Sequence, residues 1–271
     1  MSMSMKLFAS DYDGTFYKHQ NRKRLELRNN ISSVQDWQAA GNFFIFATGR
    51  SISMMKFEKK TKGLKYDYIV GLNGGIIVSK TDQVLYRKDI EPNIARGIIE
   101  LVKKHQFNNY CITDGFTGHY QFSFKWRKKS AYFLYFAKLF LKAYRLTLEE
   151  ALAQQVTQIA VETKGPEDAL AFAKLINETF NGEVTAFANL HHVDISAANL
   201  SKATGIDYVA KLHQIKNKHV FGMGDSYNDV PMFKEYHGFT LPEARTEIKN
   251  QAETVYETVG AALTDLLNQA K

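Results

Sequence analysis

The sequence predicts an α/β fold in which a parallel sheet, covered by helices on both faces, carries an inserted α+β lobe. Three observations lead to this prediction. Short apolar runs alternate with helical segments towards both ends of the chain, which is typical of a parallel sheet. The middle of the chain instead contains hairpin-like strands and separate helices. The chain has 271 residues, of which 45% are hydrophobic, which suits one large domain or two ordinary ones.

The first part of the chain alternates between strands and helices. The expected elements are a strand at 6–10, a helix at 29–41, a strand at 42–49, a helix at 51–60, a strand and turn at 66–75, and a hairpin of 75–79 with 84–88. Ile31, Val34 and Trp37 recur at helical spacing, and Gly41 is suited to end that helix. Ser51 is a candidate cap for the next helix.

The middle of the chain changes character before the alternation returns. Its expected elements are a helix from Pro92 to about His105, strands at 109–113 and 118–124, a basic aromatic helix at about 130–146, a strand at 156–162, a helix at 166–180 and a strand at 183–188. After His192 we expect strands at 192–196, 219–224 and 238–241, with helices at 201–215, 229–236 and 259–270. The predicted domains are therefore a core of residues 1–82 with 191–271, and an inserted lobe of residues 83–190.

Composition limits the classes of function. No run approaches the ~18 apolar residues of a membrane span, and the start "MSMSMKLF" lacks the apolar core of a signal peptide. We therefore expect no membrane partner. The single cysteine, Cys111, has no partner for an internal disulfide, which favours a cytoplasmic protein. The formal charge of +7 favours anionic partners. Neither zinc-finger spacing nor an RNA-binding signature is present, and no nucleic-acid partner is expected.

Polar side chains follow three apolar strands at the point where each ends. Asp11 and Asp13 follow "KLFAS", and Thr48, Gly49 and Arg50 follow "FFIFA". The strand "HVFGMG" is followed by a third polar group, which consists of Asp225, Ser226, Asn228 and Asp229. Ligands of open α/β sheets bind at the carboxyl ends of the strands, so these side chains are expected to converge.

The carboxylates in this set indicate a divalent cation. Residues i and i+2 of an extended segment point the same way, so Asp11 and Asp13 can face one pocket, and Gly14 allows a sharp turn after them. Asp225 would add a third carboxylate. Two such charges ~4 Å apart repel by about 4 kcal/mol at an effective dielectric constant of 20. Mg²⁺ prefers oxygen ligands and would remove this repulsion.

A site of magnesium and carboxylates suits phosphoryl transfer, in which the protein mainly positions groups and neutralises charge. A carboxylate can itself attack phosphorus. Thr48 could donate its hydroxyl and its backbone N–H to a phosphate oxygen. Lys202, at the start of a helix, is the best-placed lysine to offset the phosphate charge. Arg50 could reach a phosphate or pair with a surface acid.

Four stretches carry a resemblance to a known family. They are "DYDGT", "TGR" after an apolar strand, the lysine at 202, and "GDSYNDVPMF". Together they resemble the haloacid dehalogenase (HAD) superfamily. "GLNGG" and "GD-x-x-ND-x-x-M" resemble its Cof-type phosphatases of subfamily IIB, which carry a C2-type cap. The resemblance implies a Rossmann-like doubly wound core, with the inserted lobe as the cap that selects the leaving group.

The resemblance also implies residue roles. Asp11 would be the nucleophile and a metal ligand, and Asp13 the general acid and base with its backbone carbonyl on the metal. Asp225 would bind Mg²⁺, the implied cofactor. Thr48, Gly49, Lys202 and Asn228 would hold the phosphate. Asp229 would support the metal shell or orient Lys202, and Asn73 would line the cleft or simply form a turn.

One position departs from the family pattern. Ala203 follows the lysine where family members often have glycine, which leaves Lys211 as a weaker substitute for Lys202.

The leading hypothesis is a Mg²⁺-dependent phosphatase, monomeric or homodimeric, that acts on a small phosphorylated metabolite through an aspartyl phosphate. A sugar phosphate, a nucleotide or a cofactor phosphate would all fit. Three alternatives stay open. A phosphomutase could use the same aspartate pair. A non-catalytic, phosphate-sensing regulator could use similar clustered aspartates, although the inserted lobe has no role in one. A peripheral membrane or scaffold protein could use the basic aromatic stretch at 125–146.

Overall fold

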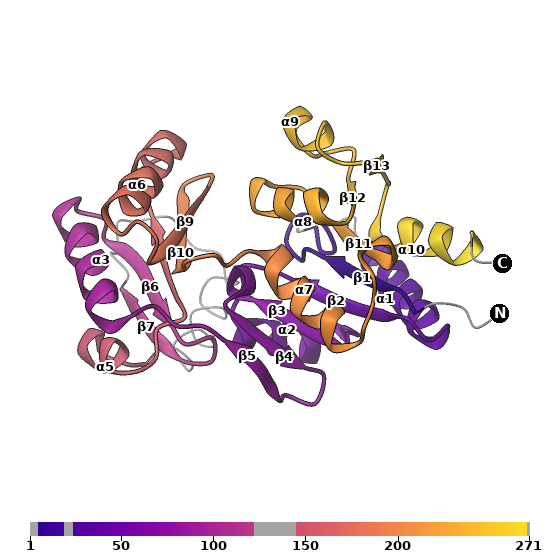
Figure 1. The fold of residues 1–271 in the computed structure, drawn as a ribbon, viewed down its shortest axis with the longest axis horizontal. Coiled ribbons are helices and arrows are strands. Elements are labelled where there is room, and N and C mark those ends of the chain that lie inside the picture. The colour runs from indigo at the N-terminus through magenta and orange to yellow at the C-terminus, as the bar shows by residue number, and fades with distance from the viewer. Residues whose placement is uncertain (1–4, 19–23, 122–144, 270–271) are drawn as a thin grey trace. The chain divides into compact units, whose positions relative to one another are not determined.

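The computed structural model describes residues 5–18, 24–121 and 145–269. The chain divides into two compact units. The larger unit contains residues 1–50, 54–86 and 201–271, and the smaller unit contains residues 51–53 and 87–200. Each unit is built around its own sheet (Figure 1).

The sheet of the larger unit has eight strands among the described residues. In spatial order they are β13 (Thr254–Val255), β12 (His237–Thr240), β11 (Val220–Met223), β1 (Leu7–Ser10), β2 (Phe43–Ala47), β3 (Tyr68–Gly71), β4 (Ile76–Ser79) and β5 (Val84–Arg87). The strands from β13 to β3 are parallel, and β4 runs antiparallel to β3. The carboxyl ends of β1, β2 and β11 therefore lie at one edge of this sheet.

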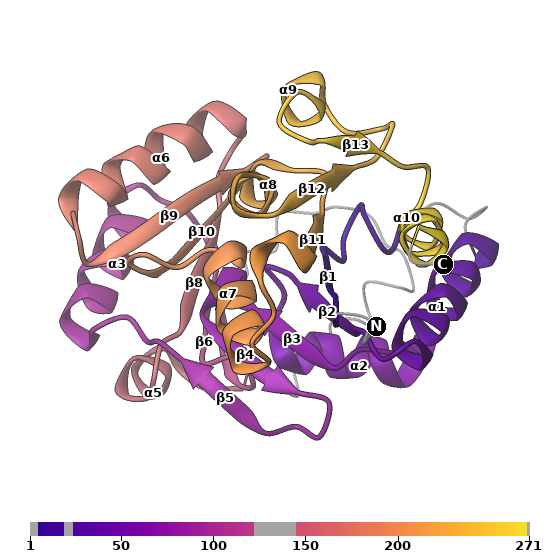
Figure 2. The same cartoon turned by 45° about the vertical axis from the view of Figure 1, so that its right-hand side comes forward.

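Helices complete the larger unit. They are α1 (Arg24–Ala39), α2 (Ile52–Lys62), α7 (Lys202–Leu212), α8 (Val230–Glu235), α9 (Thr246–Lys249) and α10 (Val259–Asn268), with short 3₁₀ turns η1 (Leu72–Gly74), η2 (Asn217–His219) and η3 (Tyr227–Asp229). Helices α1 and α10 lie side by side (Figure 2), and the N–H of Gly260 donates to Asn30 Oδ1 at 2.8 Å.

Alternation along the strands supplies both faces of this sheet. Leu7 and Ala9 of β1 belong to the same buried cluster as Ile206 of α7. Phe8, between them, points to the opposite face and meets Trp37 of α1, with ring centroids 6.1 Å apart. This period of two buries every second side chain on each face of a central parallel strand.

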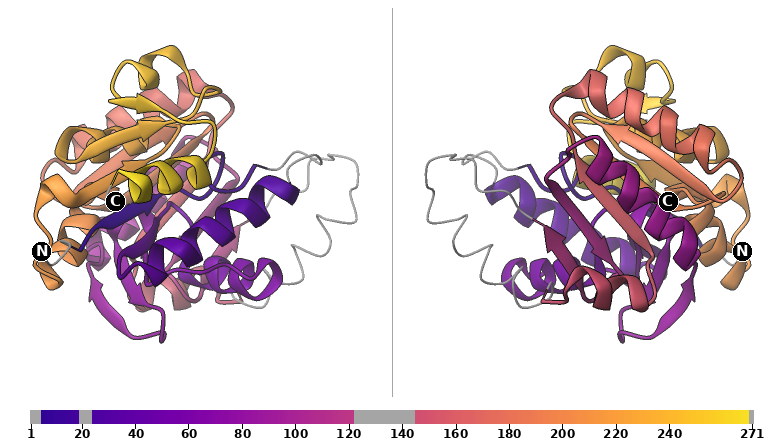
Figure 3. Two further views of the ribbon diagram at one scale, coloured as in Figure 1. Left: turned by 90° about the vertical axis from the view of Figure 1, so that its right-hand side faces the viewer. Right: turned by 90° about the vertical axis from the view of Figure 1, so that its left-hand side faces the viewer.

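The smaller unit has a five-stranded sheet in which every neighbouring pair is antiparallel. In spatial order the strands are β7 (Gly118–Gln121), β6 (Asn109–Thr113), β8 (Gln158–Glu162), β10 (His192–Ala197) and β9 (Val184–Asn189), and the helices are α3 (Pro92–Lys104), α5 (Leu148–Ala153) and α6 (Pro166–Thr179). Ile98 of α3 and Phe172 of α6 share one buried cluster with Ile159 of β8. Figure 3 shows α3 and α6 against this sheet.

The predicted fold class is confirmed: a parallel-sheet α/β core carries an inserted α+β unit. Two predicted strands were assigned to the wrong unit. The strand at 84–88 was expected in a lobe that begins at residue 83, but β5 is the last strand of the core sheet, and the smaller unit takes up the chain only at residue 87. Residues 192–196 were expected in the core, with the lobe ending at residue 190, but β10 pairs with β8 and β9 in the smaller unit, which extends to residue 200. A strand pattern indicates a strand and not its neighbour, so the partners of β10 could not be predicted from the sequence.

Two further expectations concern the remaining chain. The first helix begins at Arg24, five positions before the predicted start at 29. The basic aromatic helix expected at about 130–146 falls almost entirely outside the described residues. Among the residues that are described, no helix combines the length and the apolar character needed to cross a bilayer.

Candidate active site

Asp11 begins the site, because it is the first residue after β1. Its N–H continues the sheet by donating to Met223 O of β11 at 2.8 Å, and the residue is buried with 5% of its surface exposed. The chain then turns sharply at Gly14, whose φ is +82°. A Cβ at Gly14 would lie 2.6 Å from Asp225 Oδ2, so glycine is what lets this turn approach the loop after β11 so closely.

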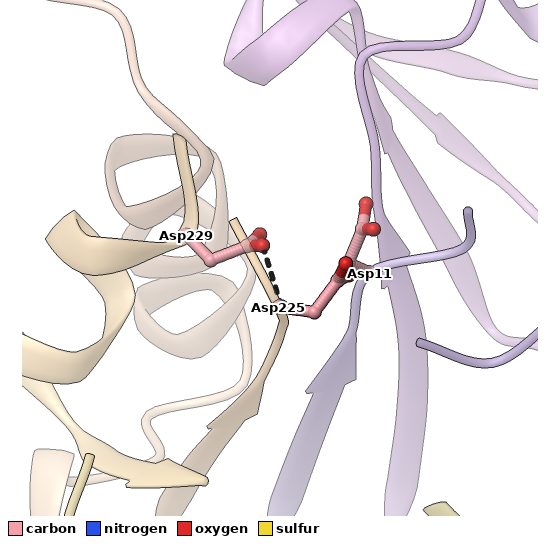
Figure 4. Close-up of side chains that lie close together, drawn as sticks. All are labelled: Asp11, Asp225 and Asp229. Carbon is pink, nitrogen blue, oxygen red and sulfur yellow. Dashed lines mark hydrogen bonds between the residues drawn. The ribbon is translucent and has the colours of Figure 1, made fainter. Parts of the chain in front are cut away.

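The loop after β11 is folded around the carboxylate of Asp229. Its Oδ2 accepts from the N–H groups of Asp225 and Ser226, both at 3.0 Å, and from Ser226 Oγ at 3.1 Å. A Cβ at Gly224 would lie 2.2 Å from Asp229 Cγ. Thr15 Oγ1 donates to Asp225 Oδ1 at 2.6 Å and so joins this loop to the segment after β1. Figure 4 shows Asp11, Asp225 and Asp229 facing one another.

Lys202 enters this group from the start of α7. Ser201 caps the helix through a reciprocal pair of bonds with Thr204, which fixes the first turn. Lys202 is 1% exposed, and its Nζ lies 2.6 Å from both Asp11 Oδ1 and Asp229 Oδ1. A buried lysine is favourable only where carboxylates of this kind compensate its charge.

Close packing of η1 against α7 sets the position of that lysine. Gly74 in η1 has a φ of +101°, and a Cβ there would lie 2.2 Å from Ser201 O. A Cβ at Gly205 would meet Val70 Cγ1 at 2.2 Å. Gly74 and Gly205 therefore allow η1 and β3 to pack closely against the start of α7, where larger residues would hold these elements apart.

The electrostatics of this cluster favour a bound cation. One oxygen from each of Asp11, Asp225 and Asp229 lies within 4.8 Å of the others. Burial raises the pKa of Asp11 well above its usual range, the nearby acids add to this, and Lys202 opposes it. Burial and the neighbouring Asp229 raise the pKa of Asp225 to about 6. Burial alone would lower the pKa of Lys202, but Asp11 and Asp229 outweigh it and raise that pKa, so the lysine stays charged.

The donor set fits Mg²⁺. It consists of carboxylate oxygens, which this hard cation prefers, and the glycines at 14 and 224 leave a cradle that side chains would otherwise fill. Lys202 supplies one positive charge against three carboxylates. A divalent cation would therefore relieve the repulsion that remains.

The other predicted site residues lie around the same sheet edge. Thr48 follows β2 and is 1% exposed, and Gly49 comes directly after it. The N–H of Thr48 donates to Val70 O at 2.9 Å. The prediction that this backbone N–H binds phosphate is therefore wrong, because the N–H already forms a hydrogen bond to β3. Asn228 Nδ2 donates to Asn73 Oδ1 at 3.1 Å, which joins the loops after β11 and β3.

Asp13 has a different environment from Asp11. Its carboxylate lies outside the three-carboxylate group and forms a fork with Arg50, with Nε to Oδ2 at 2.5 Å and Nη2 to Oδ1 at 2.6 Å. Arg50, for which a phosphate and a surface acid were both considered, therefore pairs with an acid of the predicted site.

Sequence reasoning missed two residues. Thr15 was visible as the hydroxyl of "DYDGT" but received no role. Glu58, which binds Arg50 from the buried side of α2, gave no signal because "KFEKK" looks like an ordinary solvated helix face. The substitute lysine, Lys211, is 77% exposed at its side chain and pairs with Asp207 on the surface of α7.

Comparisons with known proteins agree with this geometry. The sequence profile of the haloacid dehalogenase-like hydrolases matches residues 8–261. A Mycoplasma pneumoniae protein named "Putative phosphatase" is 25% identical over 280 residues, covering 95% of this chain and 94% of its own. A Bacillus subtilis protein, 5-amino-6-(5-phospho-D-ribitylamino)uracil phosphatase YcsE, is 20% identical over 94% of this chain and 91% of its own.

Solved structures match the fold over nearly the whole chain. The HAD phosphatase BT1666 from Bacteroides thetaiotaomicron superposes with a TM-score of 0.75 at 20% identity, covering 98% of this chain and 96% of that one. The HAD subclass IIB sugar phosphatase BT4131 gives a TM-score of 0.73 at 18% identity, with 98% and 99% covered. The resemblance found in the sequence is thereby confirmed: the chain belongs to the haloacid dehalogenase-like hydrolases and is a phosphatase of their Cof type.

Proposed function

We propose that this chain hydrolyses the phosphomonoester of a small metabolite in a Mg²⁺-dependent reaction that passes through an aspartyl phosphate on Asp11. The observation that carries the proposal is the position of the Asp11 carboxylate. Its Oδ1 lies 2.6 Å from Lys202 Nζ, and the carboxylates of Asp225 and Asp229 lie beside it. A reactive carboxylate placed among a lysine and two acids suits a site that binds an anion and a divalent cation together.

Each residue of the proposed site has a distinct part. Asp11, Asp225 and the backbone carbonyl of Asp13 would hold Mg²⁺, which when bound supplies positive charge to the phosphate. Thr48, Gly49, Lys202 and Asn228 would hold the phosphate itself. Asp229 would support them, since it receives Lys202 and two N–H groups of its own loop. Asn73 would orient Asn228 through their hydrogen bond.

The proposed reaction has two steps. In the first, Asp13 begins as the protonated acid; an Asp11 carboxylate oxygen attacks phosphorus, the phosphorus–oxygen ester bond breaks, and Asp13 gives its proton to the departing alkoxide. In the second, Asp13 takes a proton from a water molecule that attacks the phosphorus. The bond to Asp11 then breaks and inorganic phosphate leaves, which returns Asp11 to the carboxylate and Asp13 to the protonated acid. General acid and base help of this kind is typically worth about 10²–10⁴-fold in rate.

The smaller unit is proposed to act as the cap that selects the leaving group. Two relatives are named for small phosphorylated substrates, namely 5-amino-6-(5-phospho-D-ribitylamino)uracil phosphatase YcsE and the sugar phosphatase BT4131. Sugar phosphates, nucleotides and cofactor phosphates are therefore the classes to examine, and the basic character of the chain, with a formal charge of +7, suits such anions.

Turnover of a panel of these phosphates by the purified protein tests the proposal. We expect release of inorganic phosphate from at least one class in the presence of Mg²⁺. Product analysis separates this from a phosphomutase, which would return an isomeric phosphate and release none. Full activity after the metal has been removed, or no phosphate release from any ester, would overturn the proposed function.

A further inference from the structure

A buried acid that belongs to none of the family's motifs lies directly behind the proposed site. Glu58 on α2 is 2% exposed. Its Oε1 accepts from Arg50 Nη1 at 2.7 Å and its Oε2 from Tyr12 Oη at 2.8 Å, while Lys62 forms an ion pair with Oε2. A buried carboxylate is costly unless such partners compensate it, so three donors directed at one acid form a built arrangement.

Arg50 connects this acid to the proposed proton donor. Nη1 binds Glu58, while Nε and Nη2 bind the two oxygens of Asp13 at 2.5 and 2.6 Å. The guanidinium also lies over the ring of Tyr12, 4.8 Å from its centroid. A planar guanidinium held on three sides has little freedom to rotate, and its fork fixes the plane of the carboxylate that it binds.

Tyr12 ties the catalytic segment to the same acid. It lies between the two aspartates in sequence, its side chain is fully buried, and it stacks on Tyr17 with centroids 5.7 Å apart. Its hydroxyl donates to Glu58 of α2. The segment that carries Asp11 and Asp13 is therefore joined to Glu58 twice, directly through Tyr12 and indirectly through Arg50, which binds both Asp13 and Glu58.

We propose that Glu58 is a positioning residue that acts through Arg50 to set where the carboxylate of Asp13 lies. This inference rests on the proposed function, in which Asp13 moves the proton. Glu58 itself touches no reacting atom.

The physical reason is that Asp13 and Glu58 compete for the guanidinium of Arg50. Both oxygens of Asp13 are engaged by Arg50 in the structure, so Asp13 must give up one of those bonds when it reaches a leaving group. An arginine shared with a second carboxylate holds Asp13 less tightly than an arginine that has Asp13 alone. Glu58 also keeps the guanidinium anchored to α2, so that it does not follow Asp13 as that side chain moves.

The test compares two substrates that differ in their need for a proton donor. Phenyl phosphate has a poor leaving group, whereas p-nitrophenyl phosphate has a good one that departs without protonation. For Glu58→Gln, which keeps the size and removes the charge, we expect kcat/KM to fall by ~10–100-fold on phenyl phosphate, the scale of a slightly misplaced catalytic group. On p-nitrophenyl phosphate we expect a fall of less than about threefold, because that ester gains little from an acid.

Two further variants make the result decisive. Tyr12→Phe removes one hydrogen bond to Glu58 and no charge, and should show a smaller loss with the same preference between the esters; it also carries the test if Glu58→Gln does not fold. Asp67→Asn is the matched control. Asp67, which directly precedes β3, is another buried acid, 6% exposed, and its partners are Gln38 of α1, the N–H of Phe44 in β2, and Lys80, which follows β4.

The outcomes separate the two proposals. A wild-type protein that releases phosphate from neither ester and from no member of the phosphate panel contradicts the proposed function itself. A wild-type protein that is active, with Glu58→Gln and Tyr12→Phe losing equal factors on both esters or losing nothing, contradicts the positioning role. A loss that depends on the leaving group in these variants and not in Asp67→Asn supports it.

Discussion

Two aspartates only two positions apart occupy different surroundings, and this difference suggests different chemistry. The Asp11 carboxylate is buried beside Lys202, Asp225 and Asp229. The Asp13 carboxylate lies outside that group, 41% exposed, on the guanidinium of Arg50. The first environment suits a nucleophile held beside bound charges, and the second suits a group that must reach a leaving oxygen and then a water molecule.

Asp11→Asn should abolish turnover. The amide keeps the shape and can still accept a hydrogen bond from Lys202, but it lacks the negatively charged oxygen that attacks phosphorus. We expect a loss of at least ~10⁴-fold in kcat, the scale seen when an enzyme nucleophile is removed. Steady-state kinetics measures the loss, and an unchanged circular dichroism spectrum shows that the fold survives. Substantial residual turnover would favour direct attack by water instead.

The covalent intermediate should be found on Asp11. Rapid acid quench during turnover, followed by peptide mass spectrometry, is expected to place the phosphoryl group there. Lys202 lies beside both Asp11 and Asp229, but the second oxygen of Asp229 already accepts from two N–H groups of its own loop. Asp13→Asn should slow both steps while leaving the site of modification unchanged. A label on Asp13 would falsify the assignment of roles.

Metal removal should affect stability as well as activity. Without a cation, three carboxylates share one lysine, so Mg²⁺ should bind the folded state selectively. At ~100 times its dissociation constant, such a ligand raises the free energy of unfolding by about 2.7 kcal/mol. Thermal unfolding with EDTA and with Mg²⁺ measures this, and Asp225→Asn should shrink the difference. Ca²⁺ should support turnover poorly, because its coordination is longer and more flexible.

At the scale of the elements, the contact between η1 and α7 decides where Lys202 lies. Gly74 and Ser201 belong to segments far apart in sequence, yet a Cβ at Gly74 would lie 2.2 Å from Ser201 O. The first turn of α7, which Ser201 caps, carries Lys202. A change in η1 should therefore be transmitted to the lysine without touching it.

Gly74→Ala tests this transmission. Its φ of +101° and its close neighbour should together cost about 2–5 kcal/mol of stability, and displacement of α7 should lower turnover as well. Gly63→Ala is the matched control, since its φ is +72° with no atom within 4 Å of the added Cβ. It should cost only ~1–2 kcal/mol, the price of the left-handed backbone, and leave kcat unchanged. Chemical denaturation and steady-state kinetics measure both, and equal effects on kcat would contradict the transmission.

The elements also show what the sequence could and could not predict. Residues at the ends of β1, β2 and β11 were predicted to converge because parallel strands end at a common edge, and Asp11, Asp225 and Asp229 do so. The placement of β10 was not predictable, because its alternation fits either sheet. The two-residue strand β13 and the short helix α5 are too brief for a periodic signal. Glu58 was invisible, since only the tertiary fold reveals that this position of α2 is buried.

At the scale of the whole molecule, the chain contains two units with separate cores. One buried cluster joins β1, β2 and β3 to α7 and α8, and a different one joins β8 and β10 to α3 and α6. The three-carboxylate group and Lys202 belong entirely to the larger unit. The proposed chemistry therefore needs only one unit, and substrate selection is the role that we propose for the other.

Excision of the smaller unit tests that division of labour. Lys88 Nζ lies 3.0 Å from Ala198 O, so the chain enters and leaves the smaller unit at neighbouring points, and a short glycine–serine linker can replace residues 89–197. The best substrate of the phosphate panel should lose ~10²-fold or more in kcat/KM, because nothing then orients its leaving group or excludes water. The small activated ester p-nitrophenyl phosphate should lose much less, since it needs little positioning. Magnesium-dependent stabilisation of the excised protein shows that its site is intact. Equal losses on both substrates, with that stabilisation retained, would mean that the smaller unit supplies a catalytic group and not only selectivity.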